Sequence, residues 1–183
     1  MKKLVSSLLL ALCVPFAHAG STDGAMGISP HETYRMVQSQ GDQVLFIDVR
    51  DPVEVMFIGF TDEVHANIPF MVVDRHAWDE ENRRFMMRRN PEFAQQVAAA
   101  LEARGLPRDA TIITMCRSGS ERGEPSARFL RENGFAGARF VEGGFQGDVA
   151  REGERAGFRL VNGWQNSGLP WQPRMNPEKI HRP

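Results

Sequence analysis

The feature that most constrains the fold of this chain is an alternation of short apolar runs with helical patterns. Val44–Val49 and Thr111–Met115 are continuous apolar runs of strand length, as expected for strands that are covered on both faces. Ser29 opens a helix that continues toward Gln40, and a second helix is predicted over Pro91–Arg104, where apolar residues recur on one face. This alternation predicts an α/β fold with a largely parallel sheet.

The same alternation continues after the second apolar run. Ser126–Arg131 is predicted to be a helix, Ala138–Val141 is predicted to be a strand, and any helix beyond them is short. A chain of 183 residues holds one core of ordinary size. We therefore expect one domain over residues 29–171, preceded by a short lead at 20–28.

The N-terminus has the parts of a secretory signal peptide. Lys2 and Lys3 precede an apolar stretch that reaches Ala17, and Ala17 and Ala19 form a small-residue cleavage motif. Residues 1–19 are therefore predicted to be removed after Ala19, which places the mature protein in the periplasm. A membrane anchor is disfavoured because the stretch is shorter than the roughly 20 apolar residues that span a bilayer.

Cleavage would leave Cys116 as the single cysteine of the mature chain. The other cysteine, Cys13, lies within the signal, and Leu12 before it disfavours lipid attachment there. Exported proteins meet an oxidising environment in which cysteines are usually paired. An unpaired one is therefore a buried inert residue, an intermolecular bridge or a working thiol.

The segment after Thr111–Met115 favours the working thiol. Cys116 directly follows the predicted strand and a helix follows the loop, so the sulfur would lie where doubly wound sheets bind ligands, beside a helix N-terminus. Backbone N–H groups and nearby arginines favour a thiolate over a thiol. Around catalytic Cys116, the predicted substrate-binding residues are Arg117, Ser118, Gly119, Ser120, Glu121 and Arg122.

Five short motifs resemble, in the right order, those of the rhodanese domain family over nearly the whole mature chain. They are Phe46-Ile47-Asp48-Val49-Arg50, Ala66-Asn67-Ile68-Pro69-Phe70 in the segment entering the next helix, Cys116-Arg117-Ser118-Gly119, Val141-Glu142-Gly143-Gly144-Phe145 and Gly168-Leu169-Pro170. The resemblance implies a rhodanese-like sheet of about five strands with helices on both faces. It also implies that Cys116 takes a sulfane sulfur from a small anionic donor such as thiosulfate. The persulfide sulfur would pass to a thiol or cyanide-like acceptor, or to a protein.

The loop departs from the sulfurtransferase pattern at one position. Sulfurtransferase loops commonly have an arginine five residues after the cysteine, whereas Glu121 stands there in this chain and Arg122 follows. This Cys-x5-Arg spacing, with Gly123 next, resembles the rhodanese-fold cell-cycle phosphatases and arsenate reductases, whose longer loop holds a tetrahedral oxyanion. In that alternative, Cys116 would attack phosphorus and Arg122 would bind the equatorial oxygens.

Sulfur transfer is the favoured prediction for this loop. Arg117-Ser118-Gly119 resembles the sulfurtransferases, Met115 replaces the histidine that precedes the cysteine in the phosphatases, and an exported location suits thiosulfate. A carboxylate near a thiolate is unfavourable. Glu121 is therefore predicted to pair with Arg117 or Arg122, or to point to solvent.

Other candidate functions have weaker support. A non-catalytic rhodanese-type binding module is a further alternative, although such modules usually lack the cysteine. Asp48 and Arg50 are expected to give structural support, as an ion pair or hydrogen-bonded clasp near the active loop. The histidines lack short metal-ligand spacing, so no metal or other cofactor is predicted. The net charge of −1 does not suggest nucleic acid as a partner, and no membrane is expected after cleavage.

Two insertions and a tail complete the expected organisation. Residues 74–90 include four arginines around an apolar trio, and a solvated helix or loop is predicted there, with binding of an anion or a protein as the alternative. Residues 147–162 are predicted to be a surface excursion. Trp164 and Trp171 are expected to pack in the domain, and residues 172–183, with three prolines, to form a flexible tail.

Overall fold

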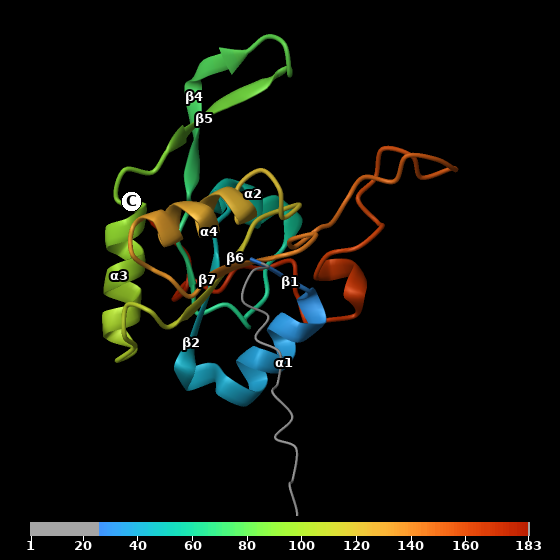
Figure 1. The fold of residues 1–183 in the computed structure, drawn as a ribbon. Coiled ribbons are helices and arrows are strands. Elements are labelled where there is room, and N and C mark those ends of the chain that lie inside the picture. The colour runs from blue at the N-terminus through green and yellow to red at the C-terminus, as the bar shows by residue number, and fades with distance from the viewer. Residues whose placement is uncertain (1–25, 183) are drawn as a thin grey trace, which may run out of the picture.

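A parallel sheet of five strands forms the centre of the structure, a computed structural model that describes residues 26–182 (Figure 1). In spatial order its strands are β1 (Gly27–Ile28), β7 (Ala138–Val141), β6 (Thr111–Met115), β2 (Val44–Asp48) and β3 (Ala66–Asn67). The α/β class and the parallel sheet are as predicted. The predicted signal peptide, residues 1–19, lies outside the described residues.

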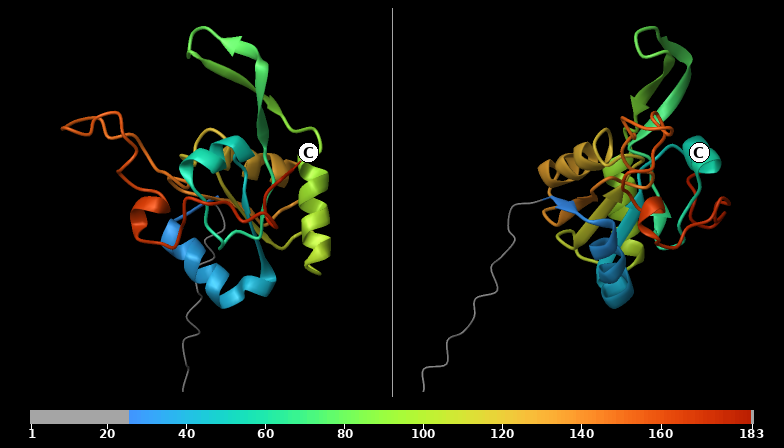
Figure 2. Two further views of the ribbon diagram at one scale, coloured as in Figure 1. Left: turned by 180° about the vertical axis from the view of Figure 1, so that it is seen from behind. Right: turned by 90° about the vertical axis from the view of Figure 1, so that its right-hand side faces the viewer.

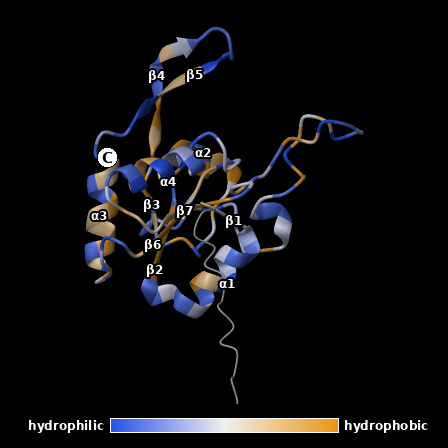
Figure 3. Cartoon of the chain, viewed as in Figure 1, coloured by the Kyte–Doolittle hydropathy of each residue, from blue (hydrophilic) through white to orange (hydrophobic). Residues whose placement is uncertain are grey.

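The central strands are apolar along their length because both of their faces are covered. Leu45 and Ile47 of β2 belong to one core, Val44 and Phe46 belong to the other, and all four are buried. Helices α3 (Phe93–Ala103) and α4 (Gly123–Glu132) cover the first face; α1 (Pro30–Gln40) and α2 (Pro52–Ile58) cover the second. The right-hand view of Figure 2 shows α4 and α2 on opposite sides of the sheet, and Figure 3 shows hydrophobic residues concentrated in the central strands.

The helices on the second face begin at side-chain caps. Ser29 Oγ accepts a hydrogen bond from the N–H of Glu32 at the start of α1, and Pro30 occupies the first helical position. Asp51 Oδ1 accepts one from the N–H of Val53 at the start of α2, a helix that the sequence analysis does not predict. Within residues 26–182, no helix is long and apolar enough to cross a membrane.

Residues 71–89 form a β-hairpin that projects from the domain (Figures 1 and 2). Strands β4 (Met71–Asp79) and β5 (Arg84–Arg89) pair antiparallel, and Trp78 packs edge-on against its cross-strand partner Phe85, with ring centroids 5.4 Å apart. The prediction of a solvated helix or loop over 74–90 is therefore wrong. The segment after Phe70 likewise enters β4, not a helix, because its apolar residues find cross-strand partners.

The segment after β7 leaves the domain and returns to it. Residues 147–162 form the predicted surface excursion, in which Val149 and Arg159 make an isolated bridge. Trp164 then packs in the core, 5.4 Å from the ring of Phe46, as expected. Trp171 also packs as expected, edge-on to Phe145, although 42% of it is exposed.

Both ends of the described chain are tied to the domain. Gly27–Ile28, part of the expected lead, forms β1 beside β7. Residues 172–182, expected to form a flexible tail, instead pack against the second face of the sheet. Gln172 and Phe60 exchange two backbone hydrogen bonds, the N–H of Asn67 donates to the carbonyl oxygen of Lys179, and Met175 and Ile180 contact the core.

Candidate active site

Cys116 directly follows β6 and lies at the N-terminus of α4. Its side chain is fully buried, and its Sγ accepts a hydrogen bond from the backbone N–H of Gly119 at 3.2 Å. Gly123, the first residue of α4, packs against the sulfur, since a Cβ built there would lie 3.4 Å from Sγ. The predicted order of strand, cysteine and helix N-terminus is thus present, and the sulfur lies at the positive end of the helix dipole.

The backbone of the active loop, residues 116–122, presents several N–H groups. Gly119 adopts a φ of +84°, a conformation that glycine takes readily, and this turns its N–H toward Sγ. Five other N–H groups of the loop find no protein acceptor within the described part of the chain; they belong to Arg117, Ser118, Ser120, Glu121 and Arg122. Consecutive N–H groups of this kind can bind an anion.

The segment after β7 fixes the shape of the active loop. The N–H of Phe145 donates to the carbonyl oxygen of Cys116 at 2.7 Å, and the N–H of Gln146 donates to that of Arg117 at 2.8 Å. Gly144 adopts a φ of +55°, and a Cβ built on it would lie 2.3 Å from the carbonyl oxygen of Cys116. Only glycine permits so close an approach of the two backbones.

Arg122 forms a buried ion pair with Glu54 of α2. Nη1 lies 2.5 Å from Oε2 and Nη2 lies 3.0 Å from Oε1. Burial by itself lowers the pKa of Arg122, but the hydrogen bonds and charge of Glu54 outweigh burial, so the pKa is raised. Nε is also buried, and it has no acceptor among the described residues. The guanidinium therefore stays charged and keeps one buried N–H for an anion.

Arg117 is oriented by Gln146, which follows the turn after β7. Its Nε donates to Gln146 Oε1 at 2.7 Å. Burial and, secondarily, the charge of Arg159 lower the pKa of Arg117. On the outer side of the loop, the hydroxyl oxygens of Ser118 and Ser120 lie 3.2 Å apart.

Glu121 points away from the thiol. Its side chain is 57% exposed and lies 3.7 Å from Nη1 of Arg84, which belongs to β5 of the hairpin. The prediction that Glu121 pairs or points to solvent is thus confirmed, although its partner is Arg84 and not Arg117 or Arg122. An exposed ion pair of this length contributes little to stability.

Asp48 and Arg50 form the predicted ion pair at the end of β2. Both side chains are fully buried, and Nη2 of Arg50 lies 2.5 Å from Oδ2 of Asp48. Arg50 also donates to the carbonyl oxygen of Gly59, and its guanidinium lies 4.2 Å from the ring centroid of Phe145. The pair therefore connects β2 with the segment that holds the active loop.

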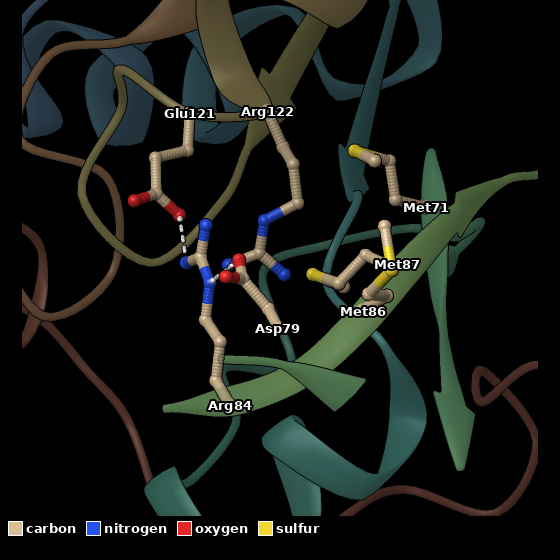
Figure 4. Close-up of a pocket in the computed structure, with 7 residues that line it drawn as sticks. All are labelled: Met71, Asp79, Arg84, Met86, Met87, Glu121 and Arg122. Atoms are coloured by element: carbon tan, nitrogen blue, oxygen red, sulfur yellow. Dashed lines mark ion pairs between the residues drawn. The ribbon is translucent and has the colours of Figure 1, made fainter. Parts of the chain in front are cut away.

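Two cavities border the active loop. One, of about 360 Å³, lies between the loop and the hairpin (Figure 4); it is lined by Met71, Asp79, Arg84, Met86, Met87, Glu121 and Arg122. The other, of about 660 Å³, lies between the loop and the excursion at 147–162 and is lined by Ser118, Ser120, Glu121, Asp148, Val149, Arg151, Arg159 and Val161. Both insertions thus form walls beside the candidate site.

The two side chains that hold the loop arginines, Glu54 for Arg122 and Gln146 for Arg117, are not identified by the sequence pattern. Glu54 lies in the first turn of α2, where a carboxylate is ordinarily explained by the helix dipole. Gln146 directly follows the motif that ends at Phe145, and that position was the signal that could have found it. Nothing in their spacing connects either residue with Cys116. Within residues 26–182 there is also no cluster of three or more histidine, cysteine or acidic side chains that could hold a metal.

Comparison with known proteins places this geometry in a family. The Rhodanese-like domain family matches residues 29–150. Among solved structures, Rv0390 from M. tuberculosis is 27% identical, covers 81% of this chain and 97% of its own, and superimposes with a TM-score of 0.57.

More distant structures include the 30 kDa polysulfide-sulfur transferase homodimer from Wolinella succinogenes, 21% identical over 66% of this chain and 69% of its own with a TM-score of 0.44. A rhodanese-related protein from Thermoplasma volcanium is 19% identical over 81% of this chain and 98% of its own, with a TM-score of 0.45. A search of curated proteins finds no match. Because the family match spans most of the sequence, the chain belongs to the rhodanese-like domain family.

Proposed function

We propose that the protein is a sulfurtransferase that carries a sulfane sulfur as a persulfide on Cys116. The observation that carries the proposal is the surroundings of Sγ. It accepts the N–H of Gly119 at the N-terminus of α4, inside a loop whose other N–H groups have no protein acceptor among the described residues. Such a loop stabilises a thiolate, a persulfide anion and an anionic donor by the same backbone dipoles.

The first step takes sulfur from thiosulfate or a similar donor. The electron pair of the Cys116 thiolate forms a new bond to the sulfane sulfur, the sulfur–sulfur bond of the donor breaks, and sulfite leaves with the electron pair of the broken bond. Because Cys116 is fully covered, the loop has to move to admit the donor. Arg117 and the serine hydroxyls at its outer side would guide the donor by charge and hydrogen bonds.

The second step returns the cysteine to its starting state. A nucleophilic acceptor, a thiolate or cyanide, attacks the outer sulfur of the persulfide, and the bond to Sγ breaks with its electron pair returning to Cys116. Arg122 keeps the positive charge that favours the persulfide anion, while Glu54 fixes its guanidinium in place. Asp48 and Arg50 act as structural support, since both are buried and paired.

Cys-x5-Arg phosphatase or arsenate reductase chemistry is the second candidate. The buried Nε of Arg122 favours it, because this N–H has no acceptor among the described residues and could donate to an oxyanion oxygen. The bidentate pairing of both terminal nitrogens with Glu54 offsets the charge available to a phosphoryl group, which favours sulfur transfer. The third candidate, a binding module, leaves the placement of Cys116 unexplained.

Mass spectrometry of the purified protein distinguishes these functions. After incubation with thiosulfate, we expect an added mass of about 32 daltons, one sulfur atom, on Cys116, which is lost on addition of cyanide. The Cys116→Ser variant is the control and should gain no mass. Phosphate release from an aryl phosphate with no persulfide would contradict sulfur transfer and favour the second candidate, and neither activity would favour the binding module.

We also propose that the protein works in the periplasm after removal of residues 1–19. The proposal rests on the two N-terminal lysines, the uncharged apolar stretch and the small residues before Gly20. Cell fractionation followed by N-terminal sequencing should find a periplasmic chain that begins at Gly20. An intact N-terminus in the cytoplasmic fraction would contradict it.

A further inference from the structure

We infer that the cavity between the active loop and the β4–β5 hairpin, the hairpin cavity, binds the sulfur acceptor. The acceptor is a small organic thiol with an apolar body and one carboxylate or sulfonate group. This inference rests on the proposed function, because it names the substrate of the second step. The cavity volume of about 360 Å³ lies in the range of small-molecule sites, which is roughly 300 to 1,000 Å³.

One wall of the hairpin cavity is formed by methionines. Met71, Met86 and Met87 line it, and Met86 is 49% exposed beside the site (Figure 4). Methionine side chains are flexible and polarisable, so they adapt to an apolar or aromatic body and to soft sulfur atoms. Met71 also packs against the first core, whereas Met86 and Met87 belong to neither core, so packing of the domain does not explain why these two lie there.

The opposite wall offers two guanidinium groups. Arg122 is only 4% exposed, and its Nε has no acceptor among residues 26–182. A buried N–H without a hydrogen bond is unfavourable, and an anionic ligand that accepts one would remove this penalty. Arg84 extends from β5 toward Glu121, at 3.7 Å, and also lies 3.8 Å from Asp79. Both pairs are long and Arg84 is 56% exposed, so the anionic group of a ligand can compete with these two carboxylates for Arg84 at little cost.

The hairpin cavity borders the active loop that covers the reactive sulfur. Arg122, which lines it, is followed by Gly123, and Gly123 packs against Sγ of Cys116. The cavity on the other side of the loop has no methionine in its lining and is more polar, since it presents two serine hydroxyls together with arginines and carboxylates. Donor and acceptor would thus approach the loop from different sides.

The transfer in this site balances without a further reactant. The acceptor thiolate attacks the outer sulfur of the Cys116 persulfide, a new sulfur–sulfur bond forms, and the bond to Sγ breaks with its electron pair remaining on Cys116. The product is the organic persulfide anion, and the number of negative charges is unchanged.

Binding of an unreactive analogue tests the site without relying on turnover. We expect calorimetry to show that 4-(methylthio)benzoate binds the purified protein, and that a Met86→Ala/Met87→Ala variant binds it at least fivefold more weakly. Met56→Ala is the matched control, since Met56 is 48% exposed on α2 and lies outside the cavity. Arg84→Gln should weaken the benzoate but not the neutral amide. Equal binding by all variants, or none by the unaltered protein, overturns the inference.

Single-turnover transfer then separates this inference from the proposed function. With the persulfide formed beforehand, the double methionine variant should need at least fivefold more 4-mercaptobenzoate for half-maximal transfer. Its reaction with cyanide should stay unchanged, because cyanide has no apolar part that could contact the methionines. Persulfide formation without binding of the analogue overturns this inference alone. Binding without any persulfide overturns the acceptor assignment together with the proposed function.

Discussion

At the scale of single residues, the active loop is held mainly by backbone contacts. Phe145 and Gln146 donate their N–H groups to carbonyl oxygens of the loop, and Gly119 donates its own to Sγ. Gly119 and Gly144 both have positive φ and close backbone neighbours. The geometry around the sulfur therefore depends on glycines that carry no chemistry themselves.

Replacing Gly144 tests this dependence. In Gly144→Ala the new Cβ would lie 2.3 Å from the carbonyl oxygen of Cys116, so the loop must shift, and we expect persulfide formation at least tenfold slower. Gly105→Ala is the control, because Gly105 also has a positive φ, +66°, but open space around it. Gly105→Ala should lose about 1 kcal/mol of folding stability from its positive φ alone, and Gly144→Ala should lose more because of the backbone clash. A slow reaction in both variants would contradict the steric explanation.

His65 makes the stability of the fold depend on pH. Its Nδ1 accepts the N–H of Phe46 at 2.9 Å, and burial, then the charges of Arg104 and Lys179, lower its pKa from 6.5 to about 4 against the opposing charge of Asp42. The unfolded chain therefore takes up a proton near pH 6.5 that the folded chain does not accept until about pH 4.

The stability that neutral His65 contributes is therefore fully present above pH 6.5 and is lost as the pH decreases from 6.5 toward 4. Because His65 is partly exposed, solvent screening reduces the expected loss to about 1 to 2 kcal/mol. Urea unfolding at pH 7.5 and pH 4.5 should show a smaller loss for His65→Gln, whose amide oxygen can accept the same N–H. The same loss in both proteins would exclude His65 as the cause.

At the scale of elements, Asp51 organises the surroundings of the site at the end of β2. One carboxylate oxygen caps α2, which supplies Glu54 to Arg122, and the other accepts the N–H of Val73 at 2.8 Å in the first half of the hairpin. The hairpin contacts the core only near its base, where Met71 packs against the first core and Arg89 lies over the rings of Phe70 and Phe129. The two elements that border the loop thus share one anchoring residue.

The outer part of the hairpin should therefore be removable. Asp74 and Met86 are cross-strand partners, so replacing residues 75–85 by Asn-Gly joins the remaining strands through a two-residue turn. We expect the shortened protein to melt within a few degrees of the original and to form the persulfide at a similar rate, because the core and active loop are unchanged. Loss of folding would show that the tip stabilises the domain.

At the scale of the whole molecule, the C-terminal segment closes the second face of the sheet. A chain ending at Trp171 would lose the two backbone hydrogen bonds between Phe60 and Gln172 and the packing of Met175 and Ile180. We expect its free energy of unfolding to fall by about 2 to 4 kcal/mol. Removing only residues 182–183 is the control in the same urea experiment, and equal stability of the two shortened chains would contradict this role.

The sequence by itself determines the sheet, the main helices and the place of the cysteine. The apolar runs at 44–49 and 111–115 are long enough for strands and too short for most helices, and the cap at Ser29 marks the start of α1. Cys116 follows from these local signals, because the end of a parallel strand before a helix is where ligands bind.

Only the tertiary structure decides what surrounds that cysteine. Glu54, Gln146, Arg84 and the methionines of the hairpin are far from Cys116 in the sequence or lie in segments with ambiguous local patterns, and their contacts form after strands and loops have packed. The tail, rich in proline, is similarly fixed by hydrogen bonds to residues more than a hundred positions away. Local propensity specifies elements, whereas long-range pairing depends on the backbone geometry that those elements create together.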